Sequence, residues 1–371
     1  MARSTRCGRP RTGQSADMKI DRGIVAALSA AVLFGLSTPI AKTLIGGMSP
    51  LLLAGLLYSG SGIGLALVMM VRATTGARSD ITWPRGIEML WLLGAIVAGG
   101  ALAPYLLMYG LQVIDSASAS LILNLEGVFT ALLAWFVFKE NVDRRIALGM
   151  ICVIAGGVLL SLAPRYRGGD LRGPLAIGAA CLAWAIDNNL TRKVSLHDSM
   201  SIACAKGLIA GPFSVALAIH YGAPHPNLVR AVQAALVGFV GYGLSLTLFV
   251  VALRNLGTAR TGAYFSLAPF IGAALAVVLG APVSGTLLAA AVLMGVGIWL
   301  HLSENHAHRH VHDSMVHDHV HTHDEHHRHA HEPAWDGREP HSHVHTHEPL
   351  THAHAHYPDV HHRHEHHRHE H

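Results

Sequence analysis

Long apolar segments alternate with short polar connections between residues 23 and 302. Ten segments can be distinguished, and each has about the 20 residues that an α-helix needs to cross the hydrocarbon core of a bilayer. Because the backbone inside a bilayer must satisfy its own hydrogen bonds, apolar segments of this length cross it as helices. The pattern predicts an all-α integral membrane protein with helices at 23–45, 49–71, 87–111, 116–138, 145–163, 173–191, 199–221, 232–253, 258–280 and 284–302.

The last five segments echo the first five. The end of the first segment, from Phe34 to Lys42, aligns with Trp184 to Arg192, and Leu111–Ala117 aligns with Leu253–Ala259 at a spacing of 142 residues. Since each half has an odd number of helices, the second copy must enter the membrane from the opposite side. Inverted repeats of this kind are typical of secondary transporters, which bind their substrate near the midplane between the two halves.

The repeat divides the chain into four parts. They are a basic cytoplasmic N-terminal arm at 1–22, a first five-helix repeat at 23–163, a second five-helix repeat at 173–302, and a histidine-rich tail at 303–371. The first apolar segment is too long for a signal peptide, so we expect it to be retained as a helix. Met1 and Met18 both stay open as the start of the protein.

Charge sets the expected orientation. Hydrophobic residues make up 51% of the chain and charged residues only 13%. With the N-terminus inside, 16 Lys and Arg flank the inner ends of the helices and five flank the outer ends. Because cytoplasmic loops carry the excess of Lys and Arg, we expect a multi-pass protein of the cell membrane with both termini in the cytoplasm. The sequence has no nucleic-acid-binding module, and no nucleophile–base pattern or cofactor motif indicates an enzyme.

Several stretches resemble a known family. They are the helix ends Phe34-Gly35…Lys42 and Trp184…Lys193, the stretch Ser116–Glu140, and the glycine-rich fifth and tenth segments. Over residues 20–302 the chain is similar to the ten-helix EamA branch of the drug/metabolite transporter (DMT) superfamily. The resemblance implies two EamA repeats and transport of small metabolites, amino acids or drugs, often by export and often by proton or substrate exchange.

The chain also departs from that family. Many members have proline in the fourth helix where this chain has Gly127, although Pro269 occupies the matching place in the second half. Glu140 fits the usual acidic residue after the fourth helix, whereas its counterpart in the second half is Pro282. The two halves have therefore diverged, which leaves the coupling mechanism open.

Ionisable side chains inside the expected helices are candidate functional groups, because a charge there costs at least about 2.5–3.5 kcal/mol on insertion scales. Glu126 lies ten residues into the fourth helix, and Asn124 lies two residues before it on a different face. Since removal from water disfavours a charged carboxyl group, Glu126 is the candidate to carry a proton or to bind a substrate cation. The alternative is a structural, protonated Glu126 bonded to a neighbouring helix.

A second candidate pair lies in the sixth and seventh helices. Asp187, with Asn188 and Asn189 beside it, and Lys206 fall at similar depths if a helix rises 1.5 Å per residue. We expect a structural ion pair between Asp187 and Lys206. The alternative is a pair that opens during transport, so that Lys206 meets an anionic group of the substrate.

Repeat-matched helix ends are the third candidate. The stretch Ser37-Thr38-Pro39 of the first helix aligns with Asp187–Asn189 of the sixth. Pro39 lacks a backbone donor and frees a carbonyl, and kinked helices at repeat-related positions often build transporter sites. We therefore expect both helix ends to line the substrate cavity.

Histidine dominates the tail. Of the 30 histidines, 26 lie from His306 onward, and the scarcity of apolar residues predicts disorder. In an extended chain, alternate side chains share a side and can chelate Zn²⁺, Ni²⁺, Co²⁺ or Cu²⁺. The candidate metal ligands are His306, His308, His310, His312, His317, His319, His321, His323, His341, His343, His345 and His347. Metal buffering or sensing, low-complexity drift and a charge switch near about pH 6.5 stay open as roles.

Three hypotheses follow. The leading one is a secondary transporter, in the export direction, of small organic metabolites or drugs. The alternatives are a divalent metal exporter whose tail collects its cargo and a metal-binding membrane sensor or scaffold that transports nothing. The expected partners are the lipid bilayer, a small-molecule substrate and metal ions on the tail, with a homodimer left open. No cofactor is required, and the sequence leaves the substrate, the coupling ion and the direction undetermined.

Overall fold

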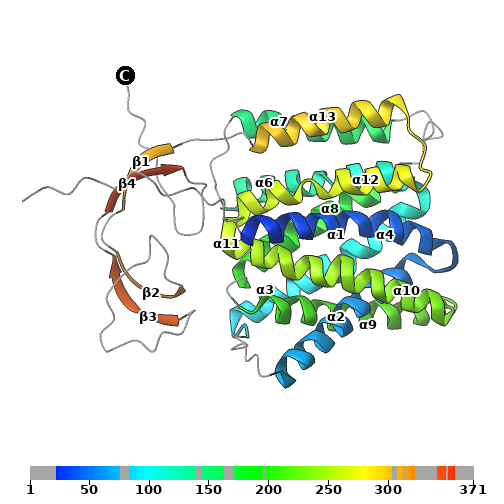
Figure 1. Ribbon diagram of the computed structural model, residues 1–371, viewed down its shortest axis with the longest axis horizontal. Coiled ribbons are helices and arrows are strands. Elements are labelled where there is room, and N and C mark those ends of the chain that lie inside the picture. The colour runs from blue at the N-terminus through cyan, green and yellow to red at the C-terminus, as the bar shows by residue number, and fades with distance from the viewer. Residues whose placement is uncertain are drawn as a thin grey trace, which may run out of the picture.

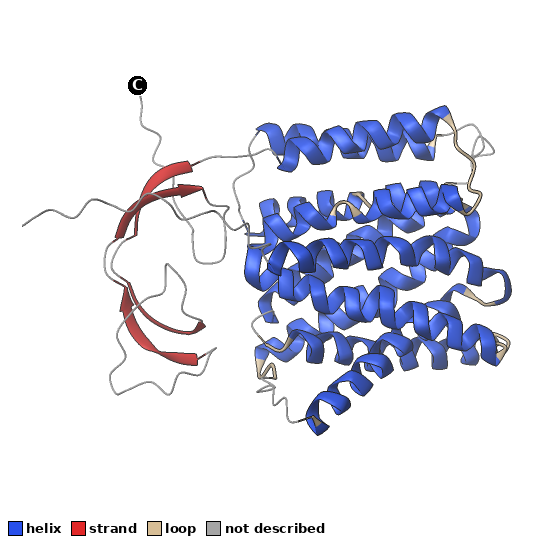
Figure 2. Cartoon of the chain, viewed as in Figure 1, coloured by secondary structure: helices blue, strands red, loops and turns tan. Residues whose placement is uncertain are grey.

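The computed structural model describes most of the helical region and four short parts of the tail. The described residues are 22–75, 83–138, 144–162, 171–194, 197–302, 307–312, 315–321, 341–347 and 350–355. The N-terminal arm before Arg22, with both candidate start sites, lies outside them, as do Glu140, His306 and His323. Helices make up one body of the structure, and strands occur only in the tail among the described residues (Figure 2).

Five helical spans form the first half. They are α1 (Arg22–Leu44), followed by the short turn η1 (Ile45–Gly47); α2 (Pro50–Thr74); α3 (Ile87–Ala95), η2 (Ile96–Leu102) and α4 (Ala103–Val113) as one span; α5 (Ser116–Ile122) and α6 (Leu125–Phe138) as one span; and α7 (Arg144–Ser161). Side-chain caps begin several of these helices. Ser49 accepts the Leu52 N–H at 3.2 Å before α2, and Asp115 accepts the Ser118 N–H at 2.9 Å before α5, as Ser and Asp do at helix N-termini.

Five further spans form the second half. They are α8 (Arg172–Val194); α9 (Ser199–His220); α10 (Leu228–Gly238), η4 (Phe239–Leu244) and α11 (Ser245–Phe265); α12 (Ala268–Val278); and α13 (Gly285–Leu302). Six segments of the described chain are long and apolar enough to cross a membrane by length and composition alone, and three shorter apolar helices accompany them. The ten-helix all-α membrane architecture is therefore confirmed.

One expected connection is missing from the second half. The apolar pattern predicts a loop at 254–257, but α11 runs without a break from Ser245 to Phe265. The matching connection of the first half is broken at Ile114, which is extended, and Asp115 then caps the next helix. Gly257 stands where the repeat has Asp115. It has no side chain to cap a new helix, so nothing local stops α11 there.

Helix packing shows the two-fold relationship between the halves. Helix α1 of the first half packs against α11 and α12 of the second, and the matching helix α8 of the second half packs against α4 and α6 of the first. Equivalent helices also pack on each other across the halves, α2 on α9 and α7 on α13 (Figure 1). The interface between the repeats therefore runs through the middle of the bundle.

Small residues allow the closest of these approaches. A Cβ atom on Gly62 of α2 would collide with the backbone of Gly207 and Leu208 in α9, and one on Gly207 would collide with Gly62. Glycine at both positions lets the two backbones meet, which is how small residues tighten helix pairs in membranes.

The described parts of the tail have an extended backbone. It contains the strands β1 (Ala307–His312), β2 (Met315–His321), β3 (His341–His347) and β4 (Leu350–Ala355), with β1 antiparallel to β4 and β2 antiparallel to β3. Composition predicts disorder for the tail, whereas the period of the sequence favours strands at these residues. Histidine alternates there with residues that include Val and Thr, and a period of two with β-branched residues favours strands.

Candidate functional site

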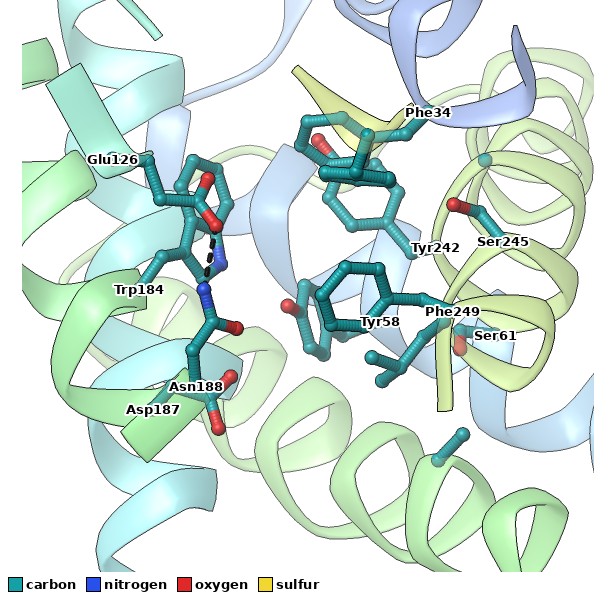
Figure 3. A pocket seen from close by; sticks show the side chains of 14 residues that line it. Phe34, Tyr58, Ser61, Glu126, Trp184, Asp187, Asn188, Tyr242, Ser245 and Phe249 are labelled. Carbon is teal, nitrogen blue, oxygen red and sulfur yellow. Dashed lines mark hydrogen bonds between the residues drawn. The ribbon is translucent and has the colours of Figure 1, made fainter. Parts of the chain in front are cut away.

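A cavity lies between the two repeats. It has an empty volume of about 580 Å³, which includes space open to solvent. Its lining combines six aromatic rings with two carboxylates and a few small polar groups (Figure 3). The lining residues are Phe34, Tyr58, Ser61, Glu126, Trp184, Asp187, Asn188, Ala203, Gly241, Tyr242, Ser245, Leu246, Phe249 and Phe265.

Interrupted helices converge on this cavity at repeat-related positions. The wide π-helical segments η2 and η4 occupy matching places in the third and eighth spans, at the spacing of 142 residues that relates the halves. A turn at 123–124 separates α5 from α6, and a turn at 266–267, 143 residues further along the chain, separates α11 from α12. Gly241 and Tyr242 of η4 line the cavity, as do Glu126 and Phe265 beside the two turns. Matched interruptions of this kind are characteristic of transporter binding sites.

Glu126 lies in the first turn of α6, immediately after the interruption of the fourth span. Its Oε1 accepts a hydrogen bond from Nδ2 of Asn188 in α8 at 2.8 Å. A helix N-terminus favours a negative charge, because unpaired N–H groups and the helix dipole point toward it. Among the described side chains, Glu126 forms no ion pair. The carboxylate is therefore held by an amide and a helix end, and it faces the cavity without a partner cation among the side chains that the structure describes.

Asp187 is neutralised within the protein, as the sequence predicts. Lys206 Nζ donates to Asp187 Oδ1 at 2.5 Å and to Thr191 Oγ1 at 2.7 Å, and the Thr191 hydroxyl donates to the same Asp187 oxygen at 2.8 Å. Lys206 is 1% exposed and Asp187 5%. The expected pair between α8 and α9 is thus confirmed, and it leaves Glu126 as the uncompensated carboxylate of the cavity lining described above.

Aromatic rings form the wall opposite Glu126. Phe34 is central to this wall, with its ring centroid 5.8 Å from that of Trp184, 5.7 Å from Tyr242 and 5.4 Å from Phe265. The Phe34–Trp184 and Phe34–Tyr242 contacts are edge-to-face, a favoured geometry because the ring edge is positive and the face negative. Tyr58 joins the wall through Tyr242, at 5.4 Å between centroids.

The π-helical segment η2 fixes two of these rings. The Gly99 carbonyl in η2 accepts hydrogen bonds from the Tyr58 hydroxyl at 2.6 Å and from Trp184 Nε1 at 3.2 Å. A Cβ atom on Gly99 would collide with the carboxyl group of Asp187. Glycine at this position therefore lets α8 approach the widened turn closely enough for its carbonyl to hold Trp184.

Other expected site residues lie behind the described lining. Asn124 is buried and donates to Leu121 O at 3.1 Å, and Asn189 donates to Ala185 O at 2.8 Å. Asn124 Nδ2 also contacts Met294 Sδ in α13 at 3.8 Å, and neither amide belongs to the described lining of the cavity.

The stretch Ser37-Thr38-Pro39 also lies behind the lining. All three residues are buried in α1, which continues unbroken as an α-helix across Pro39. The Ser37 hydroxyl donates to Phe34 O at 2.6 Å. Phe34, one turn earlier in α1, is the residue of this helix in the described lining, and a role of Ser37-Thr38-Pro39 in the cavity stays a prediction. Membrane helices tolerate proline because neighbouring helices and local polar groups compensate the missing hydrogen bond.

Across the part of the chain whose side chains are described, no three His, Cys, Asp or Glu residues converge to hold a metal ion. The tail histidines expected as ligands lie outside that part, since only the backbone of their strands is described. The cavity itself presents carboxylate, amide, hydroxyl and aromatic groups. Its chemistry suits an organic molecule with a charged or polar end and an apolar body.

Comparison with known proteins agrees with this architecture. A chain from Methanothermobacter thermautotrophicus named "Uncharacterized transporter" is 26% identical over 309 residues, covering 79% of this chain and 89% of the relative. A "Probable amino-acid metabolite efflux pump" of Salmonella typhimurium is 27% identical over 293 residues, covering 74% and 93%. A solved crystal structure shares the fold, with a TM-score of 0.55 and 21% identity over 75% of this chain and 95% of the other. The sequence matches the EamA-like transporter family at residues 21–162 and 171–303, so this chain is a membrane transporter and a member of that family.

Proposed function

We propose that this transporter exports small organic metabolites that carry a protonated amine on an apolar or aromatic body. The observation that carries the proposal is the cavity between the repeats, where an uncompensated carboxylate, Glu126, faces a wall of aromatic rings. Relatives named as amino-acid metabolite efflux pumps support the substrate class and the export direction.

The two ends of such a substrate fit different parts of the cavity. A carboxylate in a cavity of low polarity attracts a cation more strongly than it would in water. The ring faces of Trp184 and Tyr58 can pack against the apolar body and add cation–π attraction for the amine. Asn188 would orient the Glu126 carboxylate toward the amine through the bond that it already makes.

Glu126 also offers a simple coupling step. A proton on Glu126 removes the negative charge that holds the substrate cation, so proton and substrate compete for one carboxylate. A transporter that binds either of them, but not both, exchanges one for the other across the membrane. The Asp187–Lys206 pair has a supporting role in this scheme, since it holds α8 and α9 together beside the exchange site.

Orientation and location are part of the proposal. We infer a cell-membrane protein with both termini in the cytoplasm, because 16 of the flanking Lys and Arg then lie inside and five outside. Reporter fusions after Leu302 and within the 76–82 connection test this orientation. Both should report the cytoplasm, and an external signal from either would contradict it.

Transport by purified protein in proteoliposomes tests the function. We expect uptake of labelled amine-bearing metabolites, driven by a proton gradient, that falls at least tenfold in Glu126→Gln. Glu88→Gln is the matched control: it makes the same change at a carboxylate that pairs with His197 at 2.9 Å outside the cavity, and it should keep normal uptake.

Other outcomes of this assay would contradict the proposal. Proton-coupled movement of Ni²⁺, Co²⁺ or Zn²⁺ in place of organic solutes would favour a metal exporter. Full activity of Glu126→Gln would remove Glu126 from the exchange site. Absence of transport for every amine and metal would favour a sensor or scaffold.

A further inference from the structure

The strand register of the tail brings histidines from separate segments onto one face. In the β2–β3 pair, partners lie directly opposite, and they are Met315 with His347, His317 with His345, His319 with His343, and His321 with His341. Directly opposed residues share a face, and so do residues two apart along a strand. Seven histidines and one methionine therefore occupy one face of this pair, all of them residue types that bind metals.

The other face of the same pair has a different composition. It carries Val316 opposite Thr346, Asp318 opposite Val344, and Val320 opposite Ser342. Chain alternation alone would place histidines on one side of each strand. The register adds that the two histidine sides coincide, because a shift by one residue would turn one of them to the opposite face.

The β1–β4 pair repeats this arrangement. His308 lies opposite His354, His310 opposite His352, and His312 opposite Leu350, while Ala, Arg, Val and Thr fill the other face. Two separate pairs of strands thus place their histidines together, and we call these the two histidine ladders.

The spacing within a ladder suits metal coordination. Opposed Cβ atoms lie about 4.5–5.5 Å apart, and successive pairs on one face follow about 6.6–6.8 Å further along the strands, two residues at 3.3–3.4 Å each. Imidazole nitrogens bind Zn²⁺ at about 2.0–2.1 Å, usually in sets of four ligands. Two successive pairs provide four histidine positions, two on each strand, on the same face.

We propose that the two histidine ladders are binding sites for borderline divalent metal ions such as Zn²⁺, Ni²⁺, Co²⁺ or Cu²⁺, with each ion held by histidines of both strands. The proposal is independent of the transport function, because it rests on the tail alone. Metal binding and strand pairing are then linked: an isolated two-stranded hairpin is only marginally stable, and an ion that needs both strands stabilises their pairing.

Titration of the full-length protein in detergent tests the proposal. Zn²⁺ binding is followed by calorimetry, and Co²⁺ binding by the visible absorption that marks tetrahedral coordination. Three variants replace histidine by glutamine: His317, His319 and His321 in β2; His341, His343 and His345 in β3; and all six together.

Non-additivity is the expected result. Because each ion needs both strands, either triple variant should lose all ions of the β2–β3 ladder, and the sixfold variant should lose no more. A matched control changes the other face of β2, with Val316→Thr, Asp318→Asn and Val320→Thr, and should bind the same number of ions as the unchanged protein.

Three outcomes would overturn the proposal. Losses that add between the two triple variants would show that each strand binds metal alone. Loss of ions in the control variant would show that the face is irrelevant. Absence of Zn²⁺ and Co²⁺ binding by the unchanged protein would exclude the sites altogether.

Discussion

Oε1 of Glu126 accepts a hydrogen bond from Nδ2 of Asn188 at 2.8 Å, and this bond joins the fourth helical span of one repeat to the first span of the other. Glu126 lies in the first turn of the half-helix α6, whereas Asn188 lies in the C-terminal third of α8. Any motion of one repeat against the other therefore acts on this bond. The predictions below concern the groups that hold Glu126 and the cavity around it.

Removal of the amide should weaken substrate binding without removing the charge. In Asn188→Ala, the Glu126 carboxylate loses one hydrogen bond, a net effect of about 1 kcal/mol or roughly fivefold. We expect KM for an amine substrate to rise by about that factor while proton-driven uptake persists. Asn227→Ala, which removes a helix cap outside the cavity, serves as the control. An unchanged KM in Asn188→Ala would show that Glu126 is oriented by other groups.

The buried ion pair should show strong coupling in thermal unfolding. Asp187→Asn leaves the ammonium of Lys206 without its carboxylate in a buried place, which costs about 3–5 kcal/mol. The double variant Asp187→Leu with Lys206→Met removes both charges and should recover most of the lost stability. Fluorescence-detected unfolding in detergent measures both. Equal losses in the single and double variants would contradict the coupling and point to a role of Thr191 or of packing instead.

A methyl group at Gly99 should disturb the site, although it is a small change. A Cβ atom there would collide with the Asp187 carboxyl group, and crowding of this kind costs about 1–3 kcal/mol. Gly178→Ala in α8 is the matched control, since nothing lies within 4 Å of the added atom. We expect a lower melting temperature and weaker transport for Gly99→Ala and no loss for Gly178→Ala. The reverse order would refute the close approach of η2 and α8.

Loss of the Phe34 ring should weaken the binding of aromatic substrates more than that of aliphatic substrates. Phe34→Leu keeps an apolar side chain but removes edge-to-face contacts with Trp184 and Tyr242. Aromatic contacts of this kind contribute about 1 kcal/mol each, so KM for aromatic amines should rise about fivefold or more relative to aliphatic amines. Phe213→Leu, at a residue that is 60% exposed on α9, should change neither. Competition assays with paired substrates give the ratio directly.

Much of the fold follows from the sequence because membrane helices can be recognised by their length and hydrophobicity. The ten spans, the two repeats and the Asp187–Lys206 pair were all predicted from apolar runs, spacing and the cost of buried charge. Glu126 was identified as a candidate for the same reason. Each of these features can be recognised in a single sequence. A charged residue inside an apolar run, for example, is rare and costly.

The rest of the cavity cannot be recognised from the sequence in this way. A helix that is apolar on all sides does not reveal which face meets another helix and which meets lipid, so Tyr58, Tyr242, Phe249 and Phe265 were missed. Phe34 and Trp184 were noted only as matched positions of the repeat, which was the one available signal. The π-helical turn at Gly99 changes the backbone without changing the composition, and it was equally hidden. Pro39, by contrast, pointed to a stretch of α1 that lies outside the described lining.

The matched turns that precede α6 and α12 have one further consequence. A carrier built from two identical inverted halves would have inward-facing and outward-facing states of equal free energy, because exchange of the halves converts one into the other. Here Glu126 follows the first interruption, and Ala268 follows the second. The two halves of this chain differ at that place, so its symmetry does not require the inward-facing and outward-facing states to have equal free energy.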